Sequence, residues 1–320
     1  MRICLVGCGN HANSVYAPSL VRLKEEEPQI EYRACCDMDA GKAGAFRESV
    51  GFDTAYGDYV KMLETEKPDA VVLVTLPVHT AALAADILRR GFPVMMEKPI
   101  GDSLEECLSV VAASNESGAK NQAAFNRRHI PLVRELLREI KNDGKEIGHI
   151  DYKMYRHNRR EKYFHSTAVH GIDLVGYIAG HDYGSARFDY NGLDIHMQCA
   201  FIKGPTAQLS FCPAAGLVVE RLEVICDDAS YFVKLPMWNG PDSPGSIAKF
   251  SGRELVYQKT GDEISDGPLM NESNGFYAQL KYFFDAIKSG SAITHDVASA
   301  ADTMRLTDCV KRRDARYEKA

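Results

Sequence analysis

The sequence predicts an α/β domain with a doubly wound parallel sheet over residues 1–125, followed by an α+β domain with a large, open, mostly antiparallel sheet over residues 126–320. Three observations support this prediction. A chain of 320 residues is too long for one ordinary hydrophobic core, so two domains are expected. Apolar strand-like runs alternate with helical segments in the first part, whereas several strand-like runs follow one another in the second.

The composition excludes several classes of protein. A net charge of -6 gives no basic footprint for nucleic acid, and no apolar run has the length of a membrane span. The nine cysteines are odd in number and show no metal-ligand spacing, which favours buried thiols in a reducing compartment. The first predicted strand follows Met1 directly and leaves no room for a signal peptide. We therefore expect a cytoplasmic protein without a metal site, a disulfide, or a nucleic-acid or membrane partner.

A glycine-rich turn follows the first predicted strand. The apolar run 3–6 is typical of a parallel strand buried on both faces, and it leads into Gly7-Cys8-Gly9-Asn10-His11-Ala12, which matches the pattern G-x-G-x-x-A. In this pattern the first glycine makes the tight turn, the second lets the backbone approach a pyrophosphate, and the small third residue lets the next helix pack closely. The turn therefore predicts a dinucleotide site.

An acidic residue ends the second predicted strand, 30–36, at Asp37. In dinucleotide-binding folds a carboxylate in this place accepts hydrogen bonds from the adenosine 2′-hydroxyl and repels a 2′-phosphate. Asp37 therefore favours NAD over NADP, unless it only makes a turn at the strand end.

Strands and helices then alternate as far as residue 125. We expect helices over 40–49, from 58, over 80–90 and 104–117, and strands over 53–56, 70–74, 92–96 and 121–125. Between these elements, residues 75–79 form a turn that would lie beside a cofactor. The chain crosses to the second domain within residues 126–131.

The strand predicted over 92–96 ends in Glu97-Lys98-Pro99. Ligands of open α/β sheets bind at the carboxyl ends of the strands, and a partly desolvated lysine there can exchange protons with a substrate hydroxyl. The alternative is a solvated lysine that closes a strand.

Four stretches, taken in their order and spacing, resemble the glucose-fructose oxidoreductase, inositol dehydrogenase and rhizopine catabolism (Gfo/Idh/MocA) family. They are Gly7-Cys8-Gly9, Thr75-Leu76-Pro77-Val78-His79, Glu97-Lys98-Pro99 and Phe125-Asn126-Arg127-Arg128. The segment 284–309 also looks like the family's closing helices, which can pack back on the first domain. The resemblance implies a Rossmann domain that binds NAD, with Lys98 beside the nicotinamide and the substrate hydroxyl. The cofactor-binding residues are then Gly7, Gly9, Asn10, His11, Asp37, Thr75, Leu76, Pro77, His79, Glu97, Lys98 and Asn126.

In the second half we expect strands over 149–158, 195–202, 207–212, 218–226 and 230–235. The family resemblance implies that one face of this sheet commonly makes an oligomer interface. A homo-oligomer, a dimer or tetramer formed through the C-terminal sheet, is therefore expected.

An amphipathic helix is expected over 165–178, and it places His170 and Asp173 on one face. These two residues match the end of the family motif D-x-x-x-H-x-x-D, but the first aspartate falls on Ser166, and a hydroxyl cannot carry that charge. Either Ser166 supplies only a hydrogen bond, with His165 or Tyr163 taking over, or the substrate differs from the usual sugar.

Arg156 lies on the strand before this helix. It is expected to clamp a substrate carboxylate or a hydroxyl pair, or else to be a solvated residue of the sheet. The candidate substrate-binding residues are thus Arg156, Tyr163, His165, Ser166 and Asp173.

Together these features predict an NAD-dependent dehydrogenase. It would move a hydride between nicotinamide and a hydroxyl-bearing carbon of a sugar, a polyol or a related cyclic compound, with Lys98 and His170 as the catalytic residues that handle the proton. Two alternatives stay open. Some relatives oxidise and re-reduce a sugar with tightly bound NAD so that a glycosidic bond can be eliminated, and others are catalytically silent NAD-binding sensors.

Overall fold

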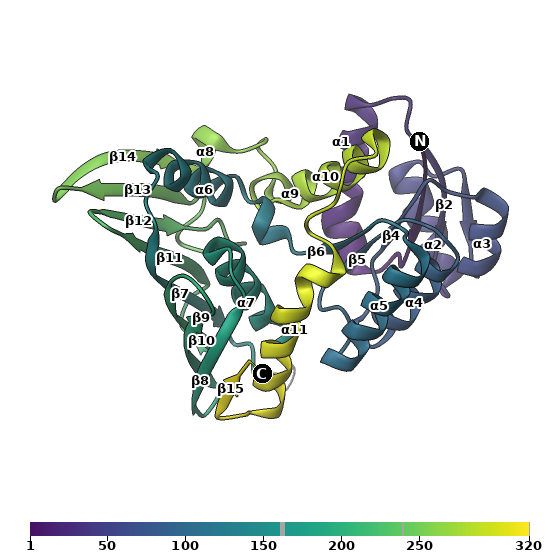
Figure 1. Ribbon diagram of the computed structural model, residues 1–320. Helices are drawn as coiled ribbons and strands as arrows, with labels where there is room; N and C mark the ends of the chain where they lie inside the picture. The colour runs from purple at the N-terminus through teal and green to yellow at the C-terminus, as the bar shows by residue number, and fades with distance from the viewer. Residues whose placement is uncertain (161–163, 239, 320) are drawn as a thin grey trace. The chain divides into compact units, whose positions relative to one another are not determined.

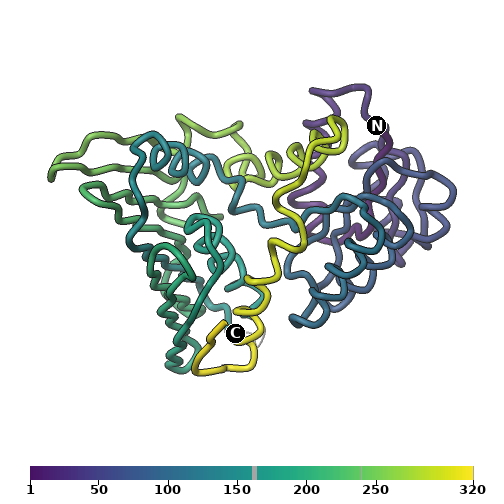
Figure 2. The backbone as a smooth tube through the Cα atoms, in the orientation of Figure 1, coloured from purple at the N-terminus to yellow at the C-terminus, as the bar shows by residue number. Residues whose placement is uncertain are grey.

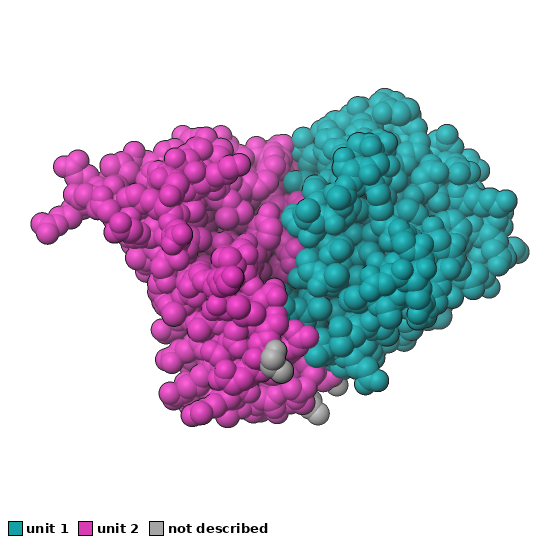
Figure 3. Space-filling view, viewed as in Figure 1, with its two compact units in different colours: residues 1–125, 276–304 teal, residues 126–275, 305–320 magenta. Residues whose placement is uncertain are grey.

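The computed structural model describes residues 1–160, 164–238 and 240–319. The chain folds into two compact units, which are coloured separately in Figure 3. Unit 1 contains Met1–Phe125 and Phe276–Met304, and unit 2 contains Asn126–Gly275 and Arg305–Ala320. The end of the chain is therefore shared between the two units.

Unit 1 is built on a six-stranded sheet with the order β3-β2-β1-β4-β5-β6 (Figure 1). Its strands are β1 (Arg2–Val6), β2 (Glu31–Cys36), β3 (Thr54–Tyr56), β4 (Ala70–Leu73), β5 (Val94–Glu97) and β6 (Asn121–Ala124). Its helices are the π-helical turn η1 (Ala12–Tyr16), α1 (Ala17–Glu26), α2 (Ala40–Val50), α3 (Tyr59–Glu66), α4 (Pro77–Arg89), α5 (Leu104–Ser117) and α10 (Phe276–Ser289). All strand pairs of this sheet are parallel, so the predicted doubly wound parallel sheet is confirmed.

The sheet of unit 1 follows from its sequence. Strands β4 and β5 are buried along their whole length, as expected of parallel strands that are covered on both faces. Two helices are capped at their N-termini by side chains that accept hydrogen bonds from backbone amides of the first turn. The Asp39 carboxylate accepts from two amides of α2, and the Ser103 hydroxyl accepts from the amide of Glu106 in α5. The strand order reverses beside β1, which is where open α/β sheets bind their ligands.

The predicted turn at residues 75–79 is mostly wrong. The helix predicted over 80–90 begins three residues earlier, at Pro77, and continues to Arg89. Proline is favoured in the first turn of a helix because the amide that it lacks has no partner there. Val74, Thr75 and Leu76 lie between β4 and α4, so only Thr75 and Leu76 of the predicted turn precede the helix.

The C-terminal segment Phe276–Met304 returns to unit 1 and packs there against the first helix (Figure 2). Helix α10 contacts α1, and the guanidinium carbon of Arg22 lies 4.1 Å from the centroid of the Tyr277 ring. The helix α11 (Val297–Arg312) begins in unit 1, and the unit boundary at residues 304 and 305 falls within it.

Unit 2 contains a nine-stranded sheet with the order β14-β13-β12-β11-β7-β10-β9-β8-β15. Its strands are β7 (Ile147–His157), β8 (Tyr183–Asn191), β9 (Asp194–Phe201), β10 (Thr206–Ala215), β11 (Val219–Cys226), β12 (Ala229–Lys234), β13 (Ser246–Ser251), β14 (Glu254–Thr260) and β15 (Arg316–Glu318). Its helices are η2 (Asn126–His129), α6 (Pro131–Asp143), α7 (His165–Ala179), α8 (Gly261–Ile264) and α9 (Met270–Ser273). Only β7 and β10 pair in parallel, which confirms a mostly antiparallel sheet.

Helices α6 and α7 cover one face of this sheet (Figure 1). Buried residues alternate with partly exposed ones along β7, so the described part of unit 2 covers its other face only in part. Helix α7 packs closely on β7 and β10: a Cβ atom at Gly171 would lie 2.2 Å from the Tyr152 ring and 2.8 Å from the Phe211 ring. The helix predicted over 165–178 is confirmed by α7, but most of its residues are buried, so it is not amphipathic as expected.

The sequence did not predict helix α6 or the strands β8, β13, β14 and β15. Strand β14 has exposed or partly exposed residues throughout, so it lacks the alternation that marks a half-buried strand. Within the described ranges, no helix is both long enough and apolar enough to cross a membrane.

Candidate functional site

The glycine turn of unit 1 combines one closely packed glycine and one open glycine. Gly7 has φ +96°, and a Cβ atom there would lie 2.1 Å from the carbonyl oxygen of Val74. A Cβ atom at Gly9 would meet no atom within 4 Å. The side-chain amide of Asn13 donates to the carbonyl oxygens of Cys8 and Gly9, at 3.0 and 2.9 Å, and holds the turn in shape. Gly7 thus serves packing of the sheet, whereas Gly9 leaves room for a ligand.

Asp37 lies at the end of β2 beside this turn. Its Oδ2 accepts the amide of Cys8 at 2.8 Å, and its Oδ1 accepts the amide of Asp39 at 2.9 Å. Each carboxylate oxygen can accept more than one hydrogen bond, so a ribose hydroxyl can still bind there. The carboxylate both shapes the turn and presents a negative charge at the ligand-binding edge of the sheet.

Two apolar side chains stand at the carboxyl end of β4. Leu76 and Val78 are 68% and 62% exposed, which is unusual for residues at the start of a helix that packs on the sheet. Thr75 lies beside them, with its hydroxyl 3.1 Å from that of Thr80, and His79 is exposed in the first turn of α4. An apolar wall at this edge fits a ligand with flat rings.

A buried carboxylate lies at the end of β5. Oε1 of Glu97 accepts the hydroxyl of Tyr16 at 2.5 Å and Nε2 of His11 at 3.1 Å, and Oε2 accepts the amide of Lys98 at 3.1 Å. Burial alone would raise the pKa of Glu97, but the nearby His11 and Lys98 and these hydrogen bonds hold it below its usual value. Burial and the neighbouring Glu97 together raise the pKa of Tyr16 well above its usual value. Glu97 is therefore an anion at neutral pH and Tyr16 is neutral.

Lys98 follows this carboxylate at the same edge of the sheet. It is half-buried, and its peptide bond to Pro99 is cis. The residues predicted around the cofactor in unit 1 thus lie at the carboxyl ends of β1, β2, β4 and β5, which is the edge where the strand order reverses.

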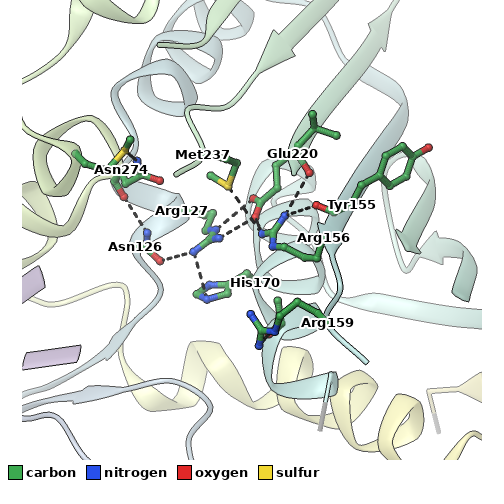
Figure 4. Close-up of polar contacts among 12 residues, drawn as sticks. Asn126, Arg127, Tyr155, Arg156, Arg159, His170, Glu220, Met237 and Asn274 are labelled. Atoms are coloured by element: carbon green, nitrogen blue, oxygen red, sulfur yellow. Dashed lines mark hydrogen bonds and ion pairs between the residues drawn. The ribbon is translucent and has the colours of Figure 1, made fainter. Parts of the chain in front are cut away.

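A second group of polar residues lies in unit 2 (Figure 4). Glu220 of β11 is fully buried, and both its oxygens bind the guanidinium of Arg127, at 2.8 Å to Nη2 and 3.3 Å to Nε. Nη2 of Arg156 donates to the same carboxylate. Burial alone would raise the pKa of Glu220, but the two guanidinium groups lower it to about 2. Two cations therefore share one buried anion.

His170 joins this group through Arg127, whose Nη1 lies 3.2 Å from Nε2 of the imidazole. A guanidinium can only donate, so Nε2 of His170 accepts, and the proton of a neutral imidazole is then on Nδ1. The same Nη1 donates to Oδ1 of Asn126 at 3.0 Å, and the Asn126 amide donates to the carbonyl oxygen of Asn274 at 2.8 Å (Figure 4). Asn126 is thus held by residues of unit 2.

Asp173 lies one turn further along α7 and binds the next arginine. Its two oxygens accept from Nε and Nη2 of Arg128 at 2.9 and 2.5 Å, and both side chains are buried. His170 and Asp173 therefore lie on the side of α7 that meets η2, which agrees with the shared face expected from their spacing.

The other residues predicted to bind substrate have different surroundings. Arg156 is buried, and its Nη1 donates to the carbonyl oxygens of Tyr155 and Val219, so the alternative that it is a solvated residue of the sheet is wrong. His165 is buried and Ser166 half-buried in the first turn of α7. Tyr163 lies outside the described residues.

The sequence did not single out Glu220, Arg127, Arg128 or Tyr16 for a role. Arg127 and Arg128 belong to a stretch that resembles the family, and Glu220 lies in the predicted strand 218–226. The same strand also contains Arg221 and Glu223, so its composition does not distinguish Glu220 as the buried acid. Its partners come from β7 and η2, which sequence spacing does not reveal.

The parallel sheet with a glycine turn after β1 and an acid after β2 defines unit 1 as a dinucleotide-binding α/β domain. Residues 1–125 match the family model described as "Oxidoreductase family, NAD-binding Rossmann fold". This match agrees with the Gfo/Idh/MocA family that the sequence resemblance implied for this part of the chain.

Known proteins resemble both this domain and the whole fold. An inositol 2-dehydrogenase/D-chiro-inositol 3-dehydrogenase of Lactiplantibacillus plantarum is 24% identical over 213 residues, which is 64% of this chain and 59% of the relative. The chain thus spans about three fifths of the length of that curated relative.

Two solved structures share the fold of the complete chain. A Gfo/Idh/MocA family oxidoreductase of Vibrio cholerae has a TM-score of 0.80 at 19% identity and covers 98% of this chain and 97% of its own. An oxidoreductase of Agrobacterium radiobacter, in complex with NAD+, L-tartaric acid and magnesium, has a TM-score of 0.81 at 14% identity and covers 99% and 98%.

Proposed function

We propose that this protein is an NAD(H)-dependent oxidoreductase that moves a hydride between nicotinamide and a hydroxyl-bearing carbon of a sugar, a polyol or a related cyclic compound. The observation that carries the proposal is the set of groups at the edge of the parallel sheet of unit 1: an open glycine turn, an acid after β2 and a half-buried lysine after β5. The inositol dehydrogenase relatives favour a polyol or cyclic alcohol as the substrate.

Asp37 supports NAD over NADP as the cofactor. A 2′-phosphate would bring two negative charges close to this carboxylate, whereas a 2′-hydroxyl can donate to it. One structural relative binds NAD+, while another, a mutant of a 3-ketoreductase of Actinomadura kijaniata, was solved in complex with NADP, so the choice rests on the residues of this chain.

The nicotinamide supplies hydride transfer when it is bound, and side chains of this chain manage the proton. We assign the hydroxyl proton to the amine of Lys98, because Nε2 of His170 already accepts a hydrogen bond from Arg127. Arg128 and Arg127 hold Asp173 and His170 in their positions on α7, and Ser166 offers a hydroxyl at the position where the family resemblance implies an aspartate.

The test is NADH fluorescence with purified protein, NAD+ or NADP+, and a panel of sugars, inositols and sugar acids. The proposal expects NADH to form with one class of hydroxyl compound and NAD+ to be preferred. Tight NAD+ binding without turnover across the whole panel would contradict it and indicate a sensor. Turnover of glycosides without net NADH would indicate transient oxidation.

The assembly and location of the protein are also proposals. The sheet face of unit 2 that carries the partly exposed residues of β7 is the surface we propose for a homo-oligomer contact. The nine cysteines are free thiols, which supports the cytoplasmic location expected from the sequence.

A further inference from the structure

Two buried guanidinium groups of unit 2 share a single carboxylate (Figure 4). Arg127 and Arg156 both bind Glu220, which is an anion at neutral pH because its pKa lies near 2. Arginine is not deprotonated in proteins, so both guanidinium groups are cations. The three side chains together therefore carry one net positive charge.

The excess charge lies on the accessible side of this group. The Glu220 side chain is fully covered, whereas the side chains of Arg127 and Arg156 each keep 10% of their surface exposed. Among the described residues, none accepts a hydrogen bond from Nε of Arg156, so this atom can donate to a ligand. A ligand that reaches the group therefore meets cations rather than the carboxylate.

Arg156 is held in one position before any ligand binds. Its Nη1 donates to the carbonyl oxygens of Tyr155 and Val219 at 2.9 and 3.3 Å, and its Nη2 donates to Glu220. Because these bonds already fix the guanidinium, binding a ligand there costs little further side-chain entropy.

The same group includes a residue predicted to handle the substrate proton. Nε2 of His170 lies 3.2 Å from Nη1 of Arg127. A third guanidinium lies on this side of α7, because Nη2 of Arg159 donates to the hydroxyl of Thr167 at 3.4 Å, three residues before His170. The cations of unit 2 are thus gathered around the histidine of the candidate substrate site.

We propose that the substrate carries a carboxylate in addition to the hydroxyl that reacts, as a sugar acid does, and that this carboxylate is the counter-ion of Arg156. The inference rests on the proposed function, since it narrows the substrate of the same reaction. It also chooses between the carboxylate and the hydroxyl pair that the sequence left open for Arg156.

The reason is the charge that each ligand supplies. A buried cation in excess of its counter-ions is destabilising, and a neutral hydroxyl pair does not change the net charge. A carboxylate compensates the excess and accepts charge-assisted hydrogen bonds from a guanidinium. The group should therefore favour an acid over a neutral compound of the same shape.

The experiment measures kcat and KM by NADH formation at saturating NAD+. The compounds are D-gluconate, D-glucuronate, their neutral amides D-gluconamide and D-glucuronamide, and myo-inositol. For at least one acid, the wild-type kcat/KM should exceed that of its amide about tenfold to a hundredfold, as expected for a hydrogen bond between charged groups. Arg156→Gln should remove most of this preference by raising KM for the acid, while KM for the amide changes little.

Two further variants separate binding from folding. Arg156→Gln leaves Arg127 and Glu220 as a pair without net charge, so the variant should fold, and thermal unfolding checks this. Arg156→Lys keeps the charge and should retain part of the preference for the acid. Arg134→Gln is the matched control, because it removes an arginine of unit 2 that pairs with Asp266, and its acid-to-amide ratio should equal that of the wild type.

Two results would overturn the inference and leave the proposed function standing. One is a wild type that forms NADH faster from the amides or myo-inositol than from both acids. The other is an Arg156→Gln variant that keeps the wild-type acid-to-amide ratio. If none of these compounds and no member of the wider panel gave NADH, the proposed function would fail together with the inference.

Discussion

Replacing Glu220 by glutamine should destabilise unit 2 strongly. The carboxylate is fully buried and compensates the guanidinium groups of Arg127 and Arg156. Removing one partner of such a buried ion pair typically costs about 3 to 5 kcal/mol, because the remaining charge is left without its counter-ion. The lowered pKa of Glu220 gives a similar free-energy cost for losing its charge. A pKa near 2 in the folded state, against about 4.3 in an unfolded chain, corresponds to about 3 kcal/mol of stability at neutral pH.

The pH dependence of this effect has a definite sign. The pKa of Glu220 is lower in the folded protein, so its stabilisation is complete above about pH 4.3 and is lost as the pH falls through about 2. The free energies of unfolding of wild type and Glu220→Gln should therefore differ most at pH 7 and approach each other below about pH 4.

Thermal unfolding followed by tryptophan fluorescence measures this difference. The chain has one tryptophan, Trp238, and it lies in unit 2, so the signal reports on that unit. We expect the midpoint to fall by about 6 to 20 °C at pH 7 for a unit of this size.

Glu223→Gln is the matched control, because Glu223 lies on the same strand and makes a partly exposed ion pair with Lys153 at 3.3 Å. Its cost should stay below about 1 kcal/mol. The reasoning is refuted if Glu220→Gln unfolds at the wild-type temperature at pH 7, or if both variants lose the same stability.

Three further predictions concern unit 1. Gly7→Ala should destabilise the unit and abolish NAD+ binding, because its Cβ would lie 2.1 Å from the carbonyl oxygen of Val74. Gly9→Ala should keep the wild-type melting temperature and only weaken NAD+ binding, because a Cβ there meets no atom within 4 Å. Circular dichroism measures the melting temperatures and calorimetry the NAD+ binding. Lys98→Ala should lower the turnover number about a hundredfold to ten-thousandfold while the Kd for NAD+ changes little, and nearly full turnover with the true substrate would contradict the assigned base. Asp37→Ala should weaken NAD+ binding and improve NADP+ binding, so unchanged Kd values for both cofactors would exclude Asp37 from the ribose site.

The sequence by itself determined the strands, turns and helix faces that short stretches of neighbouring residues specify. Apolar runs such as 3–6 and 70–74 are typical of parallel strands covered on both faces, and a glycine turn directly after the first of them indicates the ligand-binding edge of a parallel sheet. The spacing of His170 and Asp173 likewise placed both residues on one side of α7, where each meets an arginine of η2. These features depend on residues close together in the chain, so periodicity and motif spacing reveal them.

The tertiary structure decided which distant residues meet. Glu220 binds Arg127 of η2 across 93 positions of sequence and Arg156 of β7 across 64. The contact with Arg156 forms because β11 and β7 are neighbours in the sheet, with Glu220 in register with Met154. His11 meets Glu97 across 86 positions because β1 and β5 end at the same edge. Periodicity carries no information about strand order or register, so only the folded chain reveals these buried charge pairs.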